Sequence, residues 1–308
     1  MGLFSRTVVT TLPLVPKAVV GKVASRYVAG ETLDDAVATI RGLNAEGAMA
    51  TVDVLGEEVT DRGKAEAAVA EYLRVLDAIV DRGLDANVSI KPTLLGLKIG
   101  TDFCRDAIGR IAEAARERDL FVRIDMEDRT TTDATLGIYH ALQPRLGNLG
   151  VVLQAYMRRT LADVAALPAD GANVRLCKGI YIEPRQAAWK GYETVRLNFV
   201  AALEKILRRG IYVGIATHDE YLVCAALALI DRLGVPADRF EFQMLLGVDA
   251  ELRRILVAAG HRMRIYVPYG RQWERYSIRR VRENPDIAIQ AARAFLRRSP
   301  SGAMARGS

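Results

Sequence analysis

The chain has 308 residues, 50% of them hydrophobic, which is enough to bury the core of one large domain or two small ones. Its 43 basic and 37 acidic residues give a net charge of +6 and are interspersed, which argues against a nucleic-acid binder with a concentrated basic patch. Three widely separated cysteines argue against a disulfide framework and favour a reducing compartment.

The N-terminal segment, residues 1–29, is apolar but is interrupted by four basic residues and two prolines. It therefore fits neither a signal peptide nor a membrane span, and no run in the chain reaches the roughly 18 uncharged apolar residues that a span needs. We expect a cytoplasmic protein with an amphipathic leader. Mild basicity also suits a small anionic ligand or peripheral contact with the inner face of the cell membrane.

The first predicted element is a helix over 32–47, because Thr32 is followed by Asp35 and by regularly spaced apolar residues. Beyond it, short apolar runs alternate with segments of helical periodicity. The predicted strands cover residues 51–55, 87–92, 120–126, 149–156, 173–178, 211–217, 239–245 and 261–268. The clearest helical patterns between them cover residues 64–82, 101–118, 186–208 and 219–233.

Eight strands alternating with helices within about 250 residues are typical of a (βα)8 barrel. A doubly wound parallel sheet is the alternative, but GxGxxG occurs neither after the first strand nor elsewhere in the sequence. We therefore predict an α/β protein divided into N-terminal helices that pack on the barrel (1–48), the barrel itself (49–298) and a disordered tail (299–308).

Polar residues recur where the predicted strands end, and in a barrel these carboxyl ends form the active face. Each alone has an ordinary explanation, such as a helix cap or a lysine beside a loop, but their coincidence at one rim predicts a functional site. The residues at these ends are Asp53, Lys91, Asp125, Glu127, Gln154, Tyr156, Arg175, Lys178, Thr217, His218, Gln243, Tyr266 and Tyr269.

A polar stripe follows the last predicted strand. Its four residues are spaced i, i+3, i+4 and i+7 and would share one helix face: Tyr276, Arg279, Arg280 and Glu283. Two neighbouring guanidiniums can bind a carboxylate in a bidentate manner, which a lysine does not match. The stripe predicts a cradle for a small acid, and the alternative is a surface ion pair beside a packing tyrosine.

Two other classes of function stay open on these residues. A barrel lyase would use Asp125, Glu127 and His218 as metal ligands or Lys91 as a Schiff-base amine. A non-enzymatic basic module would bind membranes or RNA. The sequence has no phosphate loop, HExxH, CxxC or GxSxG motif, and its three histidines make a histidine-rich metal site unexpected.

Together the motifs resemble the proline dehydrogenase family over residues 50–285. They read, in order, VSIKP around Lys91, RIDME around Asp125, VVLQAY around Gln154, RLCKGIY around Arg175, ATHD around His218, EFQMLLG around Gln243, and YVPYG followed by Y..RR..E. The resemblance implies a monofunctional FAD enzyme with a distorted (βα)8 TIM barrel. Such an enzyme oxidises L-proline to Δ1-pyrroline-5-carboxylate, the first step of proline degradation to glutamate.

The same resemblance implies hydride transfer to flavin N5 and a membrane quinone as electron acceptor. It also implies a pyrroline-5-carboxylate dehydrogenase as a further partner, and neither nucleic acid nor a metal. Asp125 and Arg175 would be catalytic, with Arg175 near flavin N5. Glu57 would pair with Arg279 as a gate over the pocket.

The resemblance also assigns binding roles. Substrate would contact Lys91, Leu176, Tyr181, Tyr266, Tyr276, Arg279 and Arg280. FAD would contact Met126, Gln154, Arg175, Lys178, Gly179, Ile180, Thr217, His218 and Glu283.

Three features depart from the family pattern. Pro92 follows Lys91 where leucine is usual, and Asp219 follows His218 where asparagine is commoner. The interval between Tyr266 and Tyr276 is short, which indicates a trimmed loop over the site. These differences concern affinity and loop detail more than the reaction.

Overall fold

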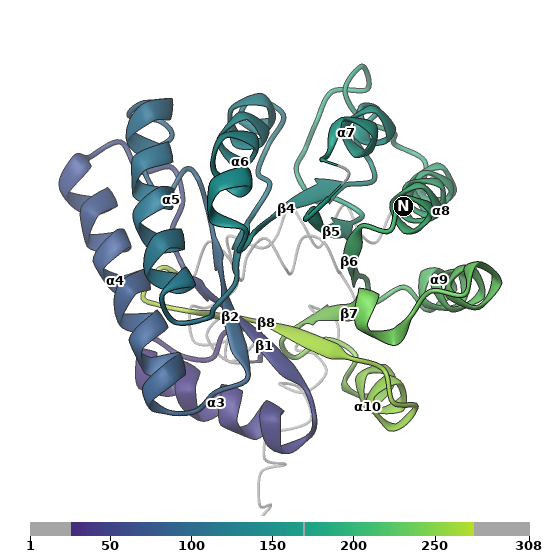
Figure 1. The fold of residues 1–308 in the computed structure, drawn as a ribbon, viewed down its shortest axis with the longest axis horizontal. Coiled ribbons are helices and arrows are strands. Elements are labelled where there is room, and N and C mark those ends of the chain that lie inside the picture. Colours follow the sequence, from purple (N-terminus) through teal and green to yellow (C-terminus); the bar gives the residue numbers. More distant parts are fainter. Residues whose placement is uncertain (1–25, 169, 274–308) are drawn as a thin grey trace, which may run out of the picture.

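A computed structural model describes residues 26–168 and 170–273 (Figure 1). Their central feature is a closed barrel of parallel strands in which each strand pairs with its neighbours in sequence and β8 returns to β1. The closed order confirms the (βα)8 barrel and excludes the doubly wound sheet. The strands are β1 Met49–Val54, β2 Ala86–Ile90, β3 Val122–Ile124, β4 Leu149–Gln154, β5 Asn173–Cys177, β6 Tyr212–Ala216, β7 Phe240–Leu245 and β8 Met263–Tyr269.

Helices surround the barrel (Figure 1). Since a parallel barrel strand is covered on its outer face by helices and on its inner face by other strands, its residues are mostly buried, and here these include the polar Arg123, Glu241 and Arg264. This burial is why all eight strands were predictable. The helices are α3 Leu33–Ala45, α4 Arg62–Asp81, α5 Thr101–Arg116, α6 Thr132–Leu146, α7 Thr160–Ala166, α8 Tyr192–Arg208, α9 Glu220–Leu233 and α10 Ala250–Ala258, with a 3-10 turn, η2, at Ala237–Arg239.

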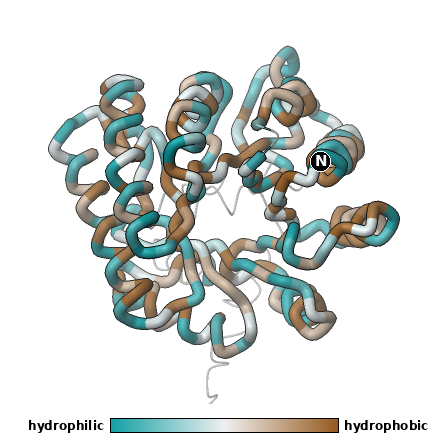
Figure 2. Tube along the Cα trace, viewed as in Figure 1, coloured by the Kyte–Doolittle hydropathy of each residue, from teal (hydrophilic) through white to brown (hydrophobic). Residues whose placement is uncertain are grey.

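The hydrophobic core lies between the strands and the helix layer. In α4 the residues that face it recur every three or four positions, namely Ala65, Val69, Tyr72, Leu76 and Ile79. Figure 2 shows the matching alternation of hydrophilic and hydrophobic residues along the outer helices. Burial of these stripes holds the helices against the barrel and keeps its strand ends in a fixed order.

Helix α3 confirms the predicted capped helix. Thr32 Oγ1 accepts a hydrogen bond from the backbone N–H of Asp35, and Asp35 Oδ2 accepts one from the backbone N–H of Thr32. The helix packs against β1 and β8, the strands whose pairing closes the barrel. The domain limits 1–48, 49–298 and 299–308 reach beyond the described residues and stay predictions.

The helix predicted over 186–208 begins later than expected, at Tyr192. The preceding segment is held away from helical geometry: Trp189 N–H donates to Tyr156 O, Ala188 bridges to Met157, and Gly191 takes an extended conformation as N-cap. Helices α6, α7 and α10 were not singled out by their patterns. Helix α6 contains an internal proline and α7 has only 7 residues, so neither gives a long amphipathic repeat.

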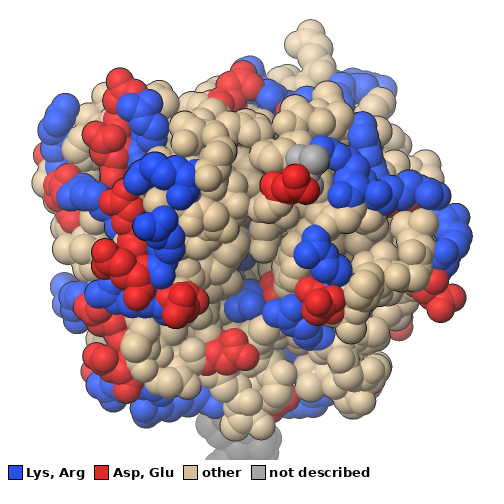
Figure 3. Space-filling view, in the orientation of Figure 1, with Lys and Arg blue, Asp and Glu red and all other residues tan. Residues whose placement is uncertain are grey.

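Charges of both signs interleave on the outer helices. Ion pairs join α4, α5 and α6 and the turn after α5, namely Arg110–Glu66, Arg118–Asp77 and Arg145–Glu113. Figure 3 shows this mixture of Lys or Arg and Asp or Glu along the edge formed by α4 and α5. Exposed pairs of this kind contribute only ~0–1 kcal/mol each. Across the described ranges, no helix combines the length and apolar character needed to span a membrane.

Candidate active site

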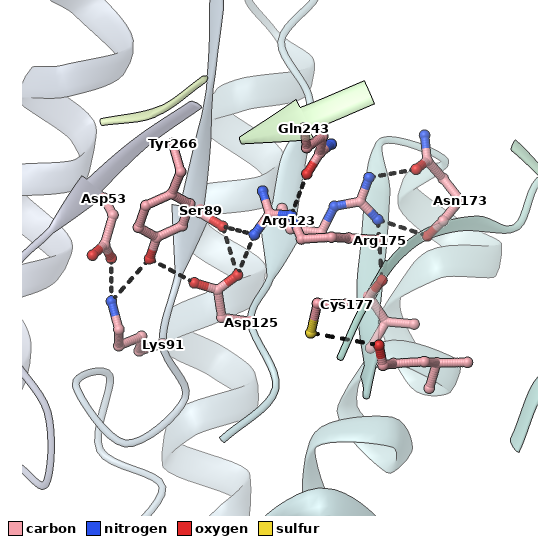
Figure 4. Close-up of polar contacts among 12 residues, drawn as sticks. Asp53, Ser89, Lys91, Arg123, Asp125, Asn173, Arg175, Cys177, Gln243 and Tyr266 are labelled. Carbon is pink, nitrogen blue, oxygen red and sulfur yellow. Dashed lines mark hydrogen bonds and ion pairs between the residues drawn. The ribbon is translucent and has the colours of Figure 1, made fainter. Parts of the chain in front are cut away.

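Asp125, directly after β3, is the centre of a hydrogen-bonded cluster inside the barrel mouth (Figure 4). Its Oδ1 accepts from Ser89 Oγ and from Arg175 Nη1, both at 2.7 Å. Its Oδ2 accepts from Tyr266 Oη at 2.9 Å. These partners come from β2, β5 and β8, so segments distant in sequence converge on one carboxylate at the rim where barrel active sites form.

Lys91 extends this cluster toward β1. Its Nζ donates to Asp53 Oδ1 at 2.5 Å and to Tyr266 Oη at 3.2 Å. Burial lowers the pKa of Lys91, but the nearby charges of Asp53 and Asp125 outweigh it, so the pKa ends above its ordinary value. A lysine that stays protonated suits the binding of an anion and is a poor Schiff-base nucleophile, which weakens the lyase alternative.

Arg175 is fixed on several sides. Its Nε donates to Gln243 Oε1 at 2.5 Å and its Nη1 donates to Ser89 Oγ at 3.0 Å, besides the contact with Asp125. The guanidinium also lies 5.4 Å from the centre of the Tyr266 ring, within cation–π range. With only 8% of its side chain exposed, Arg175 presents a positive charge in one orientation.

The adjacent strands β4, β5 and β6 carry a second group of predicted residues at their carboxyl ends. Gln154 Nε2 donates to Glu127 O at 2.8 Å, and Thr217 Oγ1 accepts from the backbone N–H of Asp219 at 3.0 Å. His218 Nε2 accepts from the backbone N–H of Leu245 at 3.5 Å. Gln154 is thus held by the segment after β3, Thr217 by the turn before α9, and His218 by the end of β7.

The loop after β5 begins with a glycine that the geometry requires. Gly179 has φ +101°, a conformation that other residues rarely adopt, and a Cβ there would lie 2.1 Å from a ring carbon of Tyr156. Beyond it, Ile180 is 38% exposed and Tyr181 is half-buried. Tight packing of Gly179 on Tyr156 thus fixes the direction in which this loop leaves the rim.

Asp219, which follows His218, anchors Lys178. Its Oδ2 accepts from Lys178 Nζ at 3.2 Å and from Tyr192 Oη at 2.7 Å, while Arg196 binds both carboxylate oxygens. Burial raises the pKa of Asp219, but these three donors outweigh it and hold the pKa well below its ordinary range. A permanent negative charge therefore sits beside Lys178.

Some predicted residues are not brought to the cluster. Leu176 follows Arg175 on β5, so its side chain points to the opposite face, where it is fully buried in the hydrophobic core. We therefore leave it out of the substrate pocket. The side chain of Met126 is also part of that core.

Glu57 is half-buried two residues beyond Leu55, after β1. The remaining predictions, Tyr276, Arg279, Arg280 and Glu283, lie outside the described residues.

The structure adds three residues to which no role was assigned from the sequence, namely Asp53, Ser89 and Gln243. Asp53 and Gln243 had been noted only as polar strand ends. Ser89 could have been found from VSIKP, since it lies two residues before Lys91 and so on the same face of β2.

Glu127 is buried near the Asp125 cluster, and its carboxylate binds Thr93. Both of its carboxylate oxygens accept from Thr93, Oε2 from the backbone N–H at 2.8 Å and Oε1 from Oγ1 at 2.6 Å. Burial raises its pKa to about 7, only partly offset by these hydrogen bonds. Among the described residues no three His, Cys, Asp or Glu side chains are close enough to hold a metal ion. The ligand set Asp125, Glu127 and His218 that a metal-dependent lyase would need is therefore not assembled.

The fold and the site define an enzyme of the (βα)8 barrel class, with a cluster of paired cations and carboxylates at the carboxyl ends of its strands. A family model described as proline dehydrogenase matches residues 36–293. Proline dehydrogenase 1 of Bacillus subtilis is 34% identical over 275 residues, which cover 89% of this chain and 91% of the relative. Proline dehydrogenase of Deinococcus radiodurans is 34% identical over 279 residues, covering 89% and 90%. The chain belongs to the proline dehydrogenase family and is an oxidoreductase that oxidises proline.

Longer proteins contain the same unit. The bifunctional protein PutA of Escherichia coli is 28% identical over 324 residues, which cover 88% of this chain but 24% of PutA. Among solved structures, proline utilization A from Bdellovibrio bacteriovorus, inactivated by N-propargylglycine, has a TM-score of 0.80 at 24% identity and covers 85% of this chain and 32% of that one. This structural similarity supports the barrel fold alone.

Proposed function

We propose that the protein catalyses FAD-dependent oxidation of L-proline to Δ1-pyrroline-5-carboxylate and passes the electrons to a membrane quinone. The observation that carries this proposal is the convergence of Lys91, Asp125, Arg175 and Tyr266 from four strands. Membership of the proline dehydrogenase family supplies the reaction. The cluster supplies a protonated lysine and a fixed guanidinium, the charges that an anionic amino acid and an electron-accepting cofactor require.

The substrate's carboxylate is the group that these cations would hold. Lys91 is cationic and lies at the rim beside Tyr266, whose ring would pack against the pyrrolidine together with Tyr181 and Tyr276. Arg279 and Arg280 would complete the carboxylate site. Because the carboxylate does not react, gripping it aligns the donor carbon without contact at the reacting atoms.

The residues at the ends of β4, β5 and β6 fit FAD by the chemistry of their donors. Arg175 and Lys178 supply positive charge, Gln154, Thr217 and His218 supply hydrogen-bonding groups, and the polar backbone of Gly179 and Ile180 lies between them. Met126, two residues after β3, would add a contact through its backbone, and Glu283 would add one from the C-terminal segment. When bound, FAD supplies the hydride acceptor, N5 of its isoalloxazine ring. The guanidinium of Arg175, which Asp125, Ser89 and Gln243 orient, would place a positive charge near the cofactor.

The substrate amine must be neutral to release a hydride from the neighbouring carbon. We therefore expect the rate of proline oxidation to rise from neutral to mildly alkaline pH. A rate that is flat or falls over this range contradicts the proposal. Lys91 does not oppose this trend, since its raised pKa keeps it cationic across the range.

The decisive experiment is anaerobic addition of L-proline to the purified protein. We expect a yellow protein whose flavin absorbance bleaches, with Δ1-pyrroline-5-carboxylate formed in stoichiometric amount. A colourless protein, or flavin that stays oxidised with saturating proline, overturns the proposal.

Re-oxidation of the bleached protein by a soluble quinone, faster in the presence of anionic vesicles, tests the acceptor and a peripheral position on the cytoplasmic face of the membrane. Conversion of the product by an added pyrroline-5-carboxylate dehydrogenase tests the second proposed partner.

A further inference from the structure

A second group of polar side chains fills the barrel interior beneath the Asp125 cluster. Glu241 and Gln243 lie two residues apart on β7, so both point to the barrel interior. Arg264 of β8 and Tyr212 of β6 flank Glu241 from the neighbouring strands. This group connects the interior of the barrel to Arg175 through Gln243 (Figure 4).

Glu241 is a buried carboxylate with a full set of donors. It accepts from Arg264 Nε at 2.7 Å and Nη2 at 3.1 Å, from Tyr212 Oη at 2.9 Å, and from Gln243 Nε2 at 2.6 Å. Burial raises the pKa of Glu241, but Arg264 and the other donors outweigh it and bring the pKa to about 2. At neutral pH Glu241 therefore only accepts hydrogen bonds.

This fixes the orientation of the Gln243 amide. Since Glu241 accepts only, the NH2 group of Gln243 must face it, and the amide oxygen then faces Arg175 Nε at 2.5 Å. Arg175 can only donate, so the neighbours on both sides of the amide require the same orientation. The amide orientation is thereby fixed, and Gln243 Oε1 gives Arg175 Nε an acceptor in a set position, besides the acceptors Ser89 and Asp125 of its Nη1.

Gly214 on β6 gives independent support. A Cβ at this position would lie 2.3 Å from Gln243 Nε2 and 2.7 Å from its Cδ. The φ of Gly214 lies outside the left-handed region, so the glycine is needed for space and not for its backbone conformation. The absence of a side chain at Gly214 thus leaves the space inside the barrel that the Gln243 side chain occupies.

We propose that Glu241 and Gln243 are positioning residues for Arg175, which they hold in the orientation that proline oxidation requires. The inference rests on the proposed role of Arg175 beside the cofactor. Glu241 acts through Gln243 and contacts neither substrate nor cofactor, and Arg264 balances its charge within the barrel.

The test exchanges the two side chains. Gln243→Glu places two carboxylates side by side and should reorient Arg175, lowering kcat about 10- to 100-fold with little change in KM for proline. In the double variant Glu241→Gln/Gln243→Glu the amide again lies between a carboxylate and a donor, so kcat should recover most of that loss.

Gly214→Ala, which crowds Gln243 without changing any charge, should lower kcat in the same way. Gly137→Ala adds a methyl group where nothing lies within 4 Å, so it should behave as the parent.

A second readout does not depend on activity. The Arg175 Nε–H signal in ¹⁵N NMR, identified by its loss in Arg175→Lys, should be protected from exchange in the parent, the double variant and Gly137→Ala. It should lose protection in Gln243→Glu and Gly214→Ala. Normal kcat in both of these variants, or reduced kcat with an unchanged Arg175 signal, overturns the inference. If the parent protein does not oxidise proline, the proposed function fails, while the NMR signal still decides whether Gln243 positions Arg175.

Discussion

Lys91 and Asp53 form an ion pair that is almost completely buried, with Nζ 2.5 Å from Oδ1 and side chains that are 8% and 0% exposed. The two residues are far apart in sequence, and they meet because β1 pairs with β2. Removal of one partner from such a pair leaves an uncompensated charge in a medium of low dielectric constant.

The first prediction concerns the stability of this pair. Lys91→Met or Asp53→Asn alone should lower the free energy of unfolding by about 3–5 kcal/mol, and the double variant should lose less than the sum. Urea denaturation of the four proteins measures the coupling. The exposed pair Lys98–Glu58, 3.6 Å apart, is the control and should show almost no coupling. Additive losses at Lys91 and Asp53 would show that the pair does not act as a unit.

The second prediction concerns the Tyr266 hydroxyl, which accepts from Lys91 and donates to Asp125. Tyr266→Phe keeps the ring beside Arg175 but removes both contacts. We expect kcat/KM for proline to fall about ten- to a hundredfold, since hydrogen bonds to charged groups contribute ~1.5–3 kcal/mol. Tyr269→Phe is the matched control on the same strand, because Tyr269 Oη donates to Glu71 of α4, away from the cluster. Equal effects of the two substitutions would argue against a role for the Tyr266 hydroxyl.

The third prediction concerns pH and Glu127, whose pKa is raised from 4.5 to about 7 by burial. The folded state then binds a proton that the unfolded state releases, so the contribution of Glu127 to stability is present below pH 4.5 and is lost as pH rises through 7. The loss amounts to about 3 kcal/mol. The difference in unfolding free energy between the parent and Glu127→Gln should therefore shift against the parent from pH 5 to pH 8. Glu251→Gln, at an exposed position in α10, is the control substitution.

The fourth prediction concerns the proposed gate. Glu57→Ala should raise KM for proline several-fold, because the carboxylate would no longer pair with Arg279 over the pocket. The loop after β1 should also become more accessible to proteases. The neighbouring Glu58, which is exposed and pairs with Lys98, provides the control substitution Glu58→Ala. Unchanged proline kinetics in Glu57→Ala would remove the gate from the mechanism.

The barrel could be predicted from the sequence because its strands are buried on both faces and their apolar runs recur at regular intervals. The start of α8 could not. Residues 186–191 have helical periodicity, but contacts with Tyr156 and Met157 in the preceding βα loop hold them in another conformation. Such contacts are not visible in a local pattern.

Part of the candidate site was also predictable from the apolar runs of the strands. Lys91, Asp125 and Arg175 stand out as charged residues at the ends of apolar strands. Glu241 and Arg264 do not, and Gln243 stands out only as a polar strand end, because their partners depend on the stagger of β6, β7 and β8 around the barrel. The roles of Tyr276, Arg279, Arg280 and Glu283 stay predictions, carried by their spacing and by the resemblance to the family.

The pairing of β8 with β1 determines when the site can form during synthesis and folding of the chain. Tyr266 reaches Lys91 and Asp125 only once residues 263–269 have docked beside the first strand of the barrel. A chain still emerging from the ribosome therefore lacks this contact until nearly all of it has been synthesised. The contacts of Asp125 with Ser89 and Arg175 and of Lys91 with Asp53 do not involve β8, so docking of this strand is the step that completes the cluster.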